Sequence, residues 1–296
     1  MVSLPAERPL SAKSGRVKAA RRLTRRSFRA EQRLFLAEGA KPLTEALHFA
    51  GHLPGGVVEV FATESASEQY AALRKAVDDA GVPWMTASDD AIAALSGAVT
   101  PQGIVAVCGF LDVDLDTVLG TAVEPAVVEE RAPASVSKPR QHHTVVICAD
   151  VRDPGNAGTV IRSADAAGSA GVVLAGNSVD PYNHKTVRAS VGSLWHLPIS
   201  VGDDPAGCVK RAQAAGFIVL ATDGAGETDL FDAETSGLLD QPVAWLFGNE
   251  SWGLPEALAA RADHRISIPI FGRAESLNLS TAAAVCLYAS ARSGRI

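Results

Sequence analysis

The sequence predicts an α/β protein of two domains, and three observations support that class. The 296 residues are 47% hydrophobic with a mean hydropathy of +0.12, which is typical of soluble globular proteins. Strand-like and helix-like runs alternate along most of the chain. Residues 121–141 are rich in Pro, Ala, Ser and charge and show no period, as linkers do. We therefore expect a smaller α/β domain in residues 1–120 and a parallel-sheet domain in residues 142–296.

The first domain is expected to alternate strands with helices after a basic segment. Short apolar runs predict strands, and helical spacing of apolar residues predicts the helices between them. The expected strands are residues 34–37, 57–62, 82–85 and 104–109, and the expected helices are 41–50, 68–80 and 89–95. Alternation at this pitch predicts a small α/β domain.

The second domain opens with residues 144–149, a run apolar enough to be a parallel strand that is buried on both faces. Further strands are expected at residues 171–174, 217–221, 243–247 and 265–268, with helices between them. Pro154 and Gly155 interrupt the chain after the first of these strands. Asn156 can then cap a helix that we expect over residues 159–167.

Charge is distributed unevenly along the chain. The net charge is −6, yet residues 1–42 contain eleven Lys or Arg and three acids, which leaves −14 for the remainder. Lys18, Arg22, Arg25 and Arg29 recur at steps of four, three and four, so a single helix would align them on one face. A solvated helix face is the plain interpretation. Clustered arginines also bind backbone phosphates, and we favour RNA binding by this face.

Several classes of site are disfavoured by the sequence. The four cysteines are far apart and form no Cys-x-x-Cys pair, so we expect buried free thiols and no zinc or redox centre. His142 and His143 have no acidic or thiol partner at ligand spacing, and we expect no metal. The glycines near residue 156 lack the spacing of a dinucleotide-binding loop, which disfavours a nicotinamide-dependent oxidoreductase.

Two features that the sequence lacks predict its location in the cell. The sequence has no apolar run of 18 residues, and its charged N-terminal segment does not resemble a secretory signal. We therefore expect a cytoplasmic protein without a membrane segment.

Three short motifs in the second domain fall at expected strand-to-helix turns. They are NAGTVIR at residues 156–162, LFGNE at 246–250 and IPIFGRAESLNLS at 268–280. Gly248 ends a buried strand, where a residue without a side chain lets a ligand approach the backbone closely. Glu250 follows at the carboxyl edge of the sheet, which is the usual ligand edge. The third motif leads into an alanine-rich helix whose first N–H groups have no partner within the helix.

Together the three motifs resemble the signature motifs of the SpoU (TrmH-type) RNA ribose 2′-O-methyltransferases, a branch of the SPOUT superfamily. The resemblance implies a trefoil knot in the parallel-sheet domain, S-adenosylmethionine as cofactor, and a homodimer in which Arg162 of one subunit works near the cofactor of the other. Arg162 would interact with the 2′-hydroxyl, and electrostatic stabilisation describes its role better than general base, since arginine holds its proton strongly.

The same resemblance assigns roles to the other motif residues. The catalytic or target-ribose residues that it implies are Asn156, Arg162, Glu250, Ser276 and Asn278. Backbone atoms of Gly248, Ile268 and Leu277 would bind the cofactor. Ile268 and Leu277 are also apolar enough to be core residues, and Ser280 is typical of a helix cap.

Two stretches of the first domain, residues 35–39 and 100–104, resemble the N-terminal substrate-binding domain of many SpoU enzymes, whose fold is like that of a ribosomal RNA-binding protein. This favours ribosomal RNA as the substrate. Transfer RNA 2′-O-methylation remains open, and so does a non-catalytic RNA-binding or ribosome-assembly role.

Overall fold

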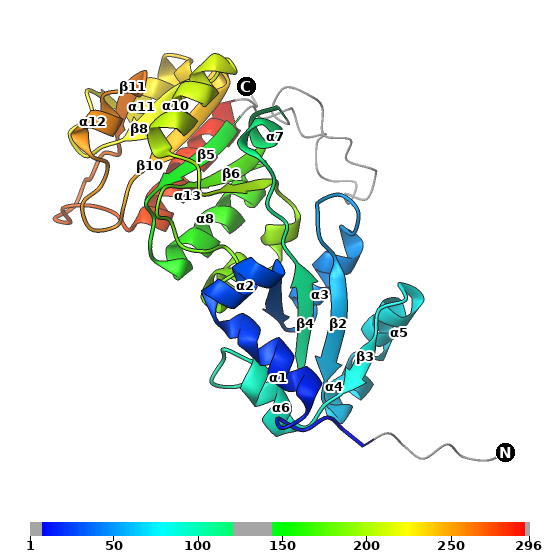
Figure 1. Ribbon diagram of the computed structural model, residues 1–296. Coiled ribbons are helices and arrows are strands. Elements are labelled where there is room, and N and C mark those ends of the chain that lie inside the picture. Colours follow the sequence, from blue (N-terminus) through cyan, green and yellow to red (C-terminus); the bar gives the residue numbers. More distant parts are fainter. Residues whose placement is uncertain (1–7, 121–143, 294–296) are drawn as a thin grey trace. The chain divides into compact units, whose positions relative to one another are not determined.

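The computed structural model describes residues 8–120 and 144–293, which form two compact units (Figure 1). The first unit joins Met1–Leu111 with Tyr182–His196, and the second joins Asp112–Pro181 with Leu197–Ile296. Each unit is therefore built from two separate segments of chain. The linker predicted at residues 121–141 and the pair His142-His143 lie outside the described residues.

The first unit contains a four-stranded mixed sheet. Its order is β1 (Leu34–Glu38), β4 (Ile104–Gly109), β2 (Val57–Ala62) and β3 (Trp84–Thr86), with only the last pair parallel. Its helices include α3 (Ala40–His48), α4 (Glu64–Gln69), α5 (Ala71–Asp79), α6 (Asp89–Leu95) and α9 (His184–Ser190). The four predicted strands are all present. The helix expected over residues 68–80 is instead two helices, because Tyr70 leaves the helical conformation between α4 and α5.

The basic segment of the first unit is not one helix. It forms α1 (Gly15–Arg21), the 3₁₀ turn η1 (Arg22–Thr24) and α2 (Arg26–Gln32). Arg25 interrupts the helix with an extended backbone, at φ −94° and ψ 129°. Val17 and Leu23, which both precede the break, are buried in the apolar core of the unit. The prediction of one continuous helix with four aligned cations is wrong.

The second unit contains a seven-stranded parallel sheet, as its alternating sequence predicts. Its order is β7 (Ile199–Val201), β6 (Gly171–Ala175), β5 (Thr144–Ala149), β10 (Val243–Phe247), β8 (Ile218–Thr222), β11 (His264–Ser267) and β9 (Thr228–Asp229). Every residue of β5, β6 and β10 is buried, which explains their uninterrupted apolar sequences. The two edge strands β7 and β9 are too short to leave a signal in the sequence.

Helices cover both faces of this sheet. Alternate side chains of β5 and β10, such as Ile147 and Leu246, pack with α7 (Leu115–Gly120) and α10 (Pro205–Ala214). The other set includes Trp245, whose indole Nε1–H donates to Ser290 Oγ of α13 at 2.9 Å. The remaining helices are α8 (Pro154–Ala166), α11 (Leu230–Thr235), α12 (Glu256–Ala259) and α13 (Leu279–Ser293), and α13 packs against α8. The core thus fixes the ends of β5, β8 and β10 at one edge.

The cysteine prediction is confirmed, since all four thiols are free and buried. Burial, with a smaller contribution from the Glu250 carboxylate, raises the pKa of Cys148 to about 12, so this thiol stays protonated. In residues 8–120 and 144–293, no helix has the length and hydropathy needed to cross a membrane. The same residues contain no group of three or more His, Cys, Asp or Glu placed to hold a metal.

Candidate active site

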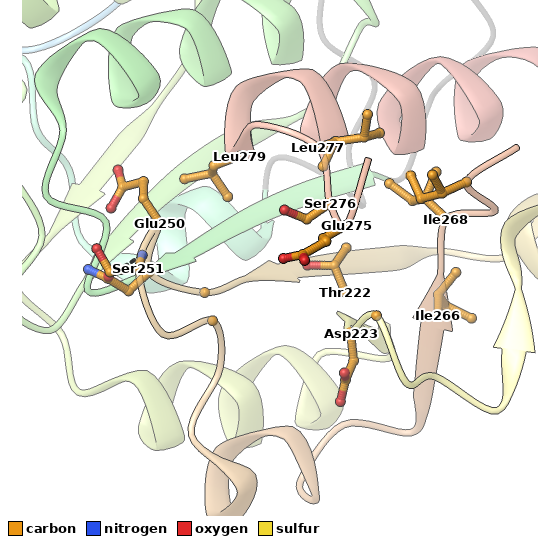
Figure 2. A pocket seen from close by; sticks show the side chains of 16 residues that line it. Thr222, Asp223, Glu250, Ser251, Ile266, Ile268, Glu275, Ser276, Leu277 and Leu279 are labelled. Atoms are coloured by element: carbon orange, nitrogen blue, oxygen red, sulfur yellow. Dashed lines mark hydrogen bonds between the residues drawn. The ribbon is translucent and has the colours of Figure 1, made fainter. Parts of the chain in front are cut away.

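A pocket of about 360 Å³ opens at the carboxyl edge of the parallel sheet in the second unit (Figure 2). It is formed where β8, β10 and β11 end and where the irregular segment before α13 passes them. Its lining residues are Thr222, Asp223, Gly224, Gly248, Asn249, Glu250, Ser251, Gly253, Ile266, Ile268, Ile270, Glu275, Ser276, Leu277, Leu279 and Ala282. The volume lies within the usual range for small-molecule sites. The second and third sequence motifs therefore share one cavity.

The Glu250 carboxylate ties this cavity to the first motif. Its Oε2 accepts a hydrogen bond from the backbone N–H of Arg152 at 3.1 Å, and its Oε1 accepts one from the backbone N–H of Asp153 at 2.9 Å. Asn156 Nδ2 also donates to Oε1, at 3.2 Å. Charge-assisted bonds to three donors hold the carboxylate at the start of α8.

Two asparagines extend this arrangement to the third motif. Asn278 Nδ2 donates to Asn156 Oδ1 at 3.1 Å, and Asn278 Oδ1 accepts from both the backbone N–H and the hydroxyl of Ser280, at 2.9 and 2.7 Å. An ionised carboxylate only accepts hydrogen bonds, so Glu250 fixes which way each amide faces. We call Glu250, Asn156 and Asn278 the amide network. It joins residues that lie 94 and 122 positions apart in the chain.

Packing of the backbone requires glycine at position 248. A Cβ at this position would lie 2.3 Å from the carbonyl carbon of Gly253 and 2.4 Å from the backbone nitrogen of Leu254. No real contact is that short, so the strand end and the following turn can pack only when residue 248 is glycine. This packing requirement is a second reason for the glycine, beside the expected close approach of a ligand, which stays a prediction. Gly248 still lines the pocket.

The lining of the pocket combines negative charge with an apolar wall. Asp223, Glu250 and Glu275 contribute carboxylates, and none of the sixteen lining residues is a lysine or arginine. Isoleucine and leucine side chains from the end of β11 and the segment before α13 form the apolar part, with Ile266, Ile268 and Leu277 among them (Figure 2). Such a cavity suits a ligand that carries both positive charge and a flat apolar group.

The predicted site residues fall into three groups. Gly248, Glu250, Ile268, Ser276 and Leu277 line the pocket, and Asn156 and Asn278 belong to the amide network. Arg162 alone forms the third group. It is exposed on α8, it does not line the pocket, and it is not part of the amide network.

Asn156 is also not the helix cap that the sequence suggested. The Asp153 side chain caps α8 by accepting from the Asn156 backbone N–H at 2.8 Å. This places Asn156 within the first turn of α8, where its amide is free to bind Glu250 and Asn278.

Sequence reasoning missed the contribution of β8. Thr222 ends this strand, and Asp223 and Gly224 follow it into the pocket. The carboxyl ends of neighbouring parallel strands form the ligand edge of such sheets, so the residues after any predicted strand were candidates. The sequence does not show that β8 is the neighbour of β10, because the order of the strands appears only in the folded sheet.

The basic segment presents three of its four predicted cations to solvent. Lys18, Arg22 and Arg25 are exposed, and the Arg22 guanidinium lies 3.9 Å from the centre of the Phe28 ring. Arg29 is only 3% exposed, and its Nη1 donates to the carbonyl oxygens of Leu23 and Thr24, each at 2.9 Å. Arg29 therefore stabilises the turn between the helices, and it is removed from the predicted RNA-binding face.

Two protein families match the chain. The SpoU rRNA Methylase family matches residues 143–288, and the MRM3-like substrate binding domain matches residues 15–106. Among curated proteins, the chain is 32% identical to the 23S rRNA (guanosine(2553)-2′-O)-methyltransferase RlmP of Bacillus subtilis, over 94% of this chain and 96% of that protein. It is 40% identical to the 23S rRNA (uridine(2479)-2′-O)-methyltransferase of Streptomyces viridochromogenes, over 47% of this chain and 49% of that protein.

Solved structures of similar sequence have the same fold. An rRNA methyltransferase from Sinorhizobium meliloti with bound AdoMet superposes with a TM-score of 0.77 at 31% identity, over 96% of each chain. The SpoU methyltransferase AviRb from Streptomyces viridochromogenes, in complex with AdoMet, gives a TM-score of 0.76 at 28% identity, over 95% of this chain and 98% of that one.

Proposed function

Because the chain belongs to the SpoU rRNA methylase family, we propose that it transfers a methyl group from S-adenosylmethionine to a ribose 2′-hydroxyl of RNA, with ribosomal RNA as the substrate class. The observation that carries this proposal is the amide network beside an acidic pocket. Three motifs that are distant in the sequence meet there through hydrogen bonds.

The pocket suits the cofactor in its charge and in its apolar lining. S-adenosylmethionine supplies an activated methyl group on a positively charged sulfur, so the transfer needs no covalent help from the protein. Carboxylates at Asp223, Glu250 and Glu275 favour a cation, while Ile268 and Leu277 offer an apolar wall to an adenine ring. Backbone groups near Gly248, Ile268 and Leu277 would hold the cofactor.

The chain's own residues align and stabilise the hydroxyl that is methylated. Ser276 lies in the pocket lining, and the amide network fixes Asn156 and Asn278 beside it. Fixed hydrogen-bonding groups hold a hydroxyl in one orientation and stabilise the charge that forms on it, without reorganising during the reaction.

Arg162 acts in a homodimer under this proposal. In the described residues it forms no ion pair and lies outside the pocket of its own chain, although it is exposed on α8. An arginine in this position is available to a second copy, where it would stabilise the developing alkoxide next to the partner's pocket. The exposed apolar side chains Val285 and Tyr288 of α13 support a contact between copies in this region.

The first unit is proposed to bind RNA through Lys18, Arg22 and Arg25. All three are exposed, they belong to a segment whose net charge is +8, and most of the segment lies in the matched substrate-binding domain. Phosphate binding by such cations releases counterions and requires no particular base sequence.

Finer features of the family are proposed in the same way. A trefoil knot in the second unit is proposed from membership of the SpoU family alone. A cytoplasmic location follows from the proposed ribosomal substrate.

The test is transfer of tritiated methyl from S-adenosylmethionine to unmodified ribosomal RNA and, separately, to unmodified transfer RNA. A single alkali-resistant linkage in ribosomal RNA is the expected product, because a 2′-O-methyl group prevents cleavage at that position. Label on transfer RNA alone would overturn the substrate. Cofactor binding without transfer to either RNA or to ribosomal particles would favour a non-catalytic assembly role.

A further inference from the structure

Trp252 differs from the other tryptophans of the chain. All four lie within the described residues. Trp195 and Trp245 are at most 3% exposed and Trp84 is half-buried, whereas Trp252 is 55% exposed. A large aromatic ring in water forgoes the stabilisation that burial would give, so its exposure needs an explanation. Trp252 lies on the turn that carries Glu250, directly after β10.

The turn holds Trp252 in a fixed position. The backbone N–H of Asn249 donates to the Gly253 carbonyl, and the Gly253 N–H donates back to Asn249, both at 2.9 Å. The Asn249 side chain, 6% exposed, donates to the Asp150 carbonyl at 2.7 Å and accepts from the Ser251 N–H at 2.8 Å. Residues 250–252 therefore form the tip of a closed loop. Because the backbone of this loop is already ordered, it would lose little conformational entropy when a ligand contacts the ring.

A cation accompanies the ring. The Arg152 guanidinium lies 5.2 Å from the centre of the Trp252 ring, within the range of cation–π attraction. The Arg152 backbone N–H donates to Glu250 Oε2, so the amide network also fixes the base of this side chain. A flat apolar surface and a planar cation are thus held together beside the proposed catalytic residues.

This pair lies outside the cofactor pocket. Ser251 and Gly253 line the pocket, whereas Trp252, between them, does not. The ring is therefore exposed outside the cofactor pocket, where a second ligand could contact it. In the proposed reaction that second ligand is RNA.

We propose that Trp252 and Arg152 bind an unpaired nucleobase of the RNA at or next to the methylated ribose, with the base stacked on the indole. This inference rests on the proposed function, since it names the part of the RNA that meets this end of the site. Proteins bind splayed bases by stacking them on aromatic rings and guanidinium groups. The Arg152 charge also suits the phosphate that accompanies each base.

Tryptophan fluorescence tests the contact without requiring turnover. Unmodified 23S ribosomal RNA made by in vitro transcription is titrated into the full-length protein without cofactor. Stacking on the exposed indole should quench its emission, and Trp252→Phe should abolish that quenching while binding within about threefold of wild type. Loss of a base–aromatic stack should weaken binding by Trp252→Ala by roughly 10- to 100-fold.

Trp252→Leu is the matched control for apolar bulk. It keeps a large side chain without a π face, so it should bind as weakly as Trp252→Ala. Unchanged wild-type emission at saturating RNA, quenching that persists in Trp252→Phe, or wild-type affinity in Trp252→Leu would each overturn the proposal. A change of emission with protein concentration that is present in wild type and absent in Trp252→Phe would also overturn it, because it would assign the ring to a second copy.

Methyl transfer is measured separately on the same RNA. Quenching that depends on Trp252, in a protein that transfers no methyl group, would support the stacking site and contradict the proposed methylation. Normal methyl transfer by Trp252→Leu would contradict the stacking site and support the proposed methylation.

Discussion

The end of the parallel sheet in the second unit and the basic segment of the first unit use polar side chains in opposite ways. At the sheet end, Glu250 receives hydrogen bonds from donors that lie 94 to 98 positions away in the sequence. In the basic segment, Lys18, Arg22 and Arg25 extend into solvent from neighbouring turns. Residues that hold one another should fail together when one is changed, whereas solvent-exposed cations should contribute separately.

Arg162 combines features of both regions, and its removal should give the largest effect. It is exposed like the cations of the basic segment, yet it belongs to the first catalytic motif. Arg162→Ala should keep cofactor affinity and lower turnover by about 10² to 10³, the usual cost of removing one group that stabilises charge developing in the transition state.

Arg261→Ala provides the matched control, because Arg261 is another exposed arginine of the second unit outside the pocket. Its turnover should stay within about twofold of wild type, as for most surface substitutions. Single-turnover methylation measures both variants. Near-normal rates in Arg162→Ala would remove Arg162 from the mechanism.

The close packing of the turn against Gly248 should be the next most sensitive point of the sheet end. Gly248→Ala places a methyl group against the backbone of residues 253 and 254, so the turn that carries Glu250 must move. The expected loss is about 3 kcal/mol in the free energy of unfolding, measured by urea denaturation. Gly224→Ala, where no atom lies within 4 Å of the added Cβ, should change stability far less. Equal losses in the two variants would contradict the account of Gly248.

Glu250→Gln tests the charge of the amide network with little change in shape. The new amide nitrogen would face a backbone donor, Arg152 N–H or Asp153 N–H, and one hydrogen bond would be lost. We expect a loss of about 1–3 kcal/mol in the free energy of unfolding, as for bonds to charged groups. Thermal unfolding measures the loss, and unchanged stability together with unchanged turnover would show that the network is dispensable.

Sequence patterns predicted the two regions unequally, for a physical reason. Buried parallel strands such as β5 and β10 need uninterrupted apolar runs, so both were located correctly. The edge strands β7 and β9 are too short for a periodic signal. The break at Arg25 was missed because the spacing of charged residues does not show where the backbone leaves the helical conformation.

The candidate site shows the same limit. Motif order identified Glu250, Asn156 and Asn278, but the hydrogen bonds among them depend on strand order, which no local pattern contains. Thr222 and Asp223 were missed for that reason. Arg29 was misassigned because a charge pattern cannot distinguish a cation in solvent from one that binds nearby carbonyl oxygens.

Charge reversal in the basic segment should give the smallest single effects. Arg22→Glu and Arg25→Glu should each weaken RNA binding about tenfold at low salt, and the loss should shrink as salt rises. Arg29→Gln is the matched contrast, since it should lower stability through the bonds to Leu23 and Thr24 while leaving the salt dependence unchanged. Filter binding across a salt series measures all three. Unchanged affinity for RNA in both charge-reversal variants would contradict the proposal that this segment binds phosphates.

A double-mutant cycle on Asn156 and Asn278 tests whether the distant motifs act as one hydrogen-bonded unit. Their side chains share a 3.1 Å hydrogen bond across 122 positions of sequence. Methylation turnover is measured for Asn156→Ala, Asn278→Ala and the double variant. If the two residues act as one unit, the double variant should be little slower than the slower single one, with a coupling of about 0.5–3 kcal/mol. Losses that multiply would show instead that Asn156 and Asn278 act independently.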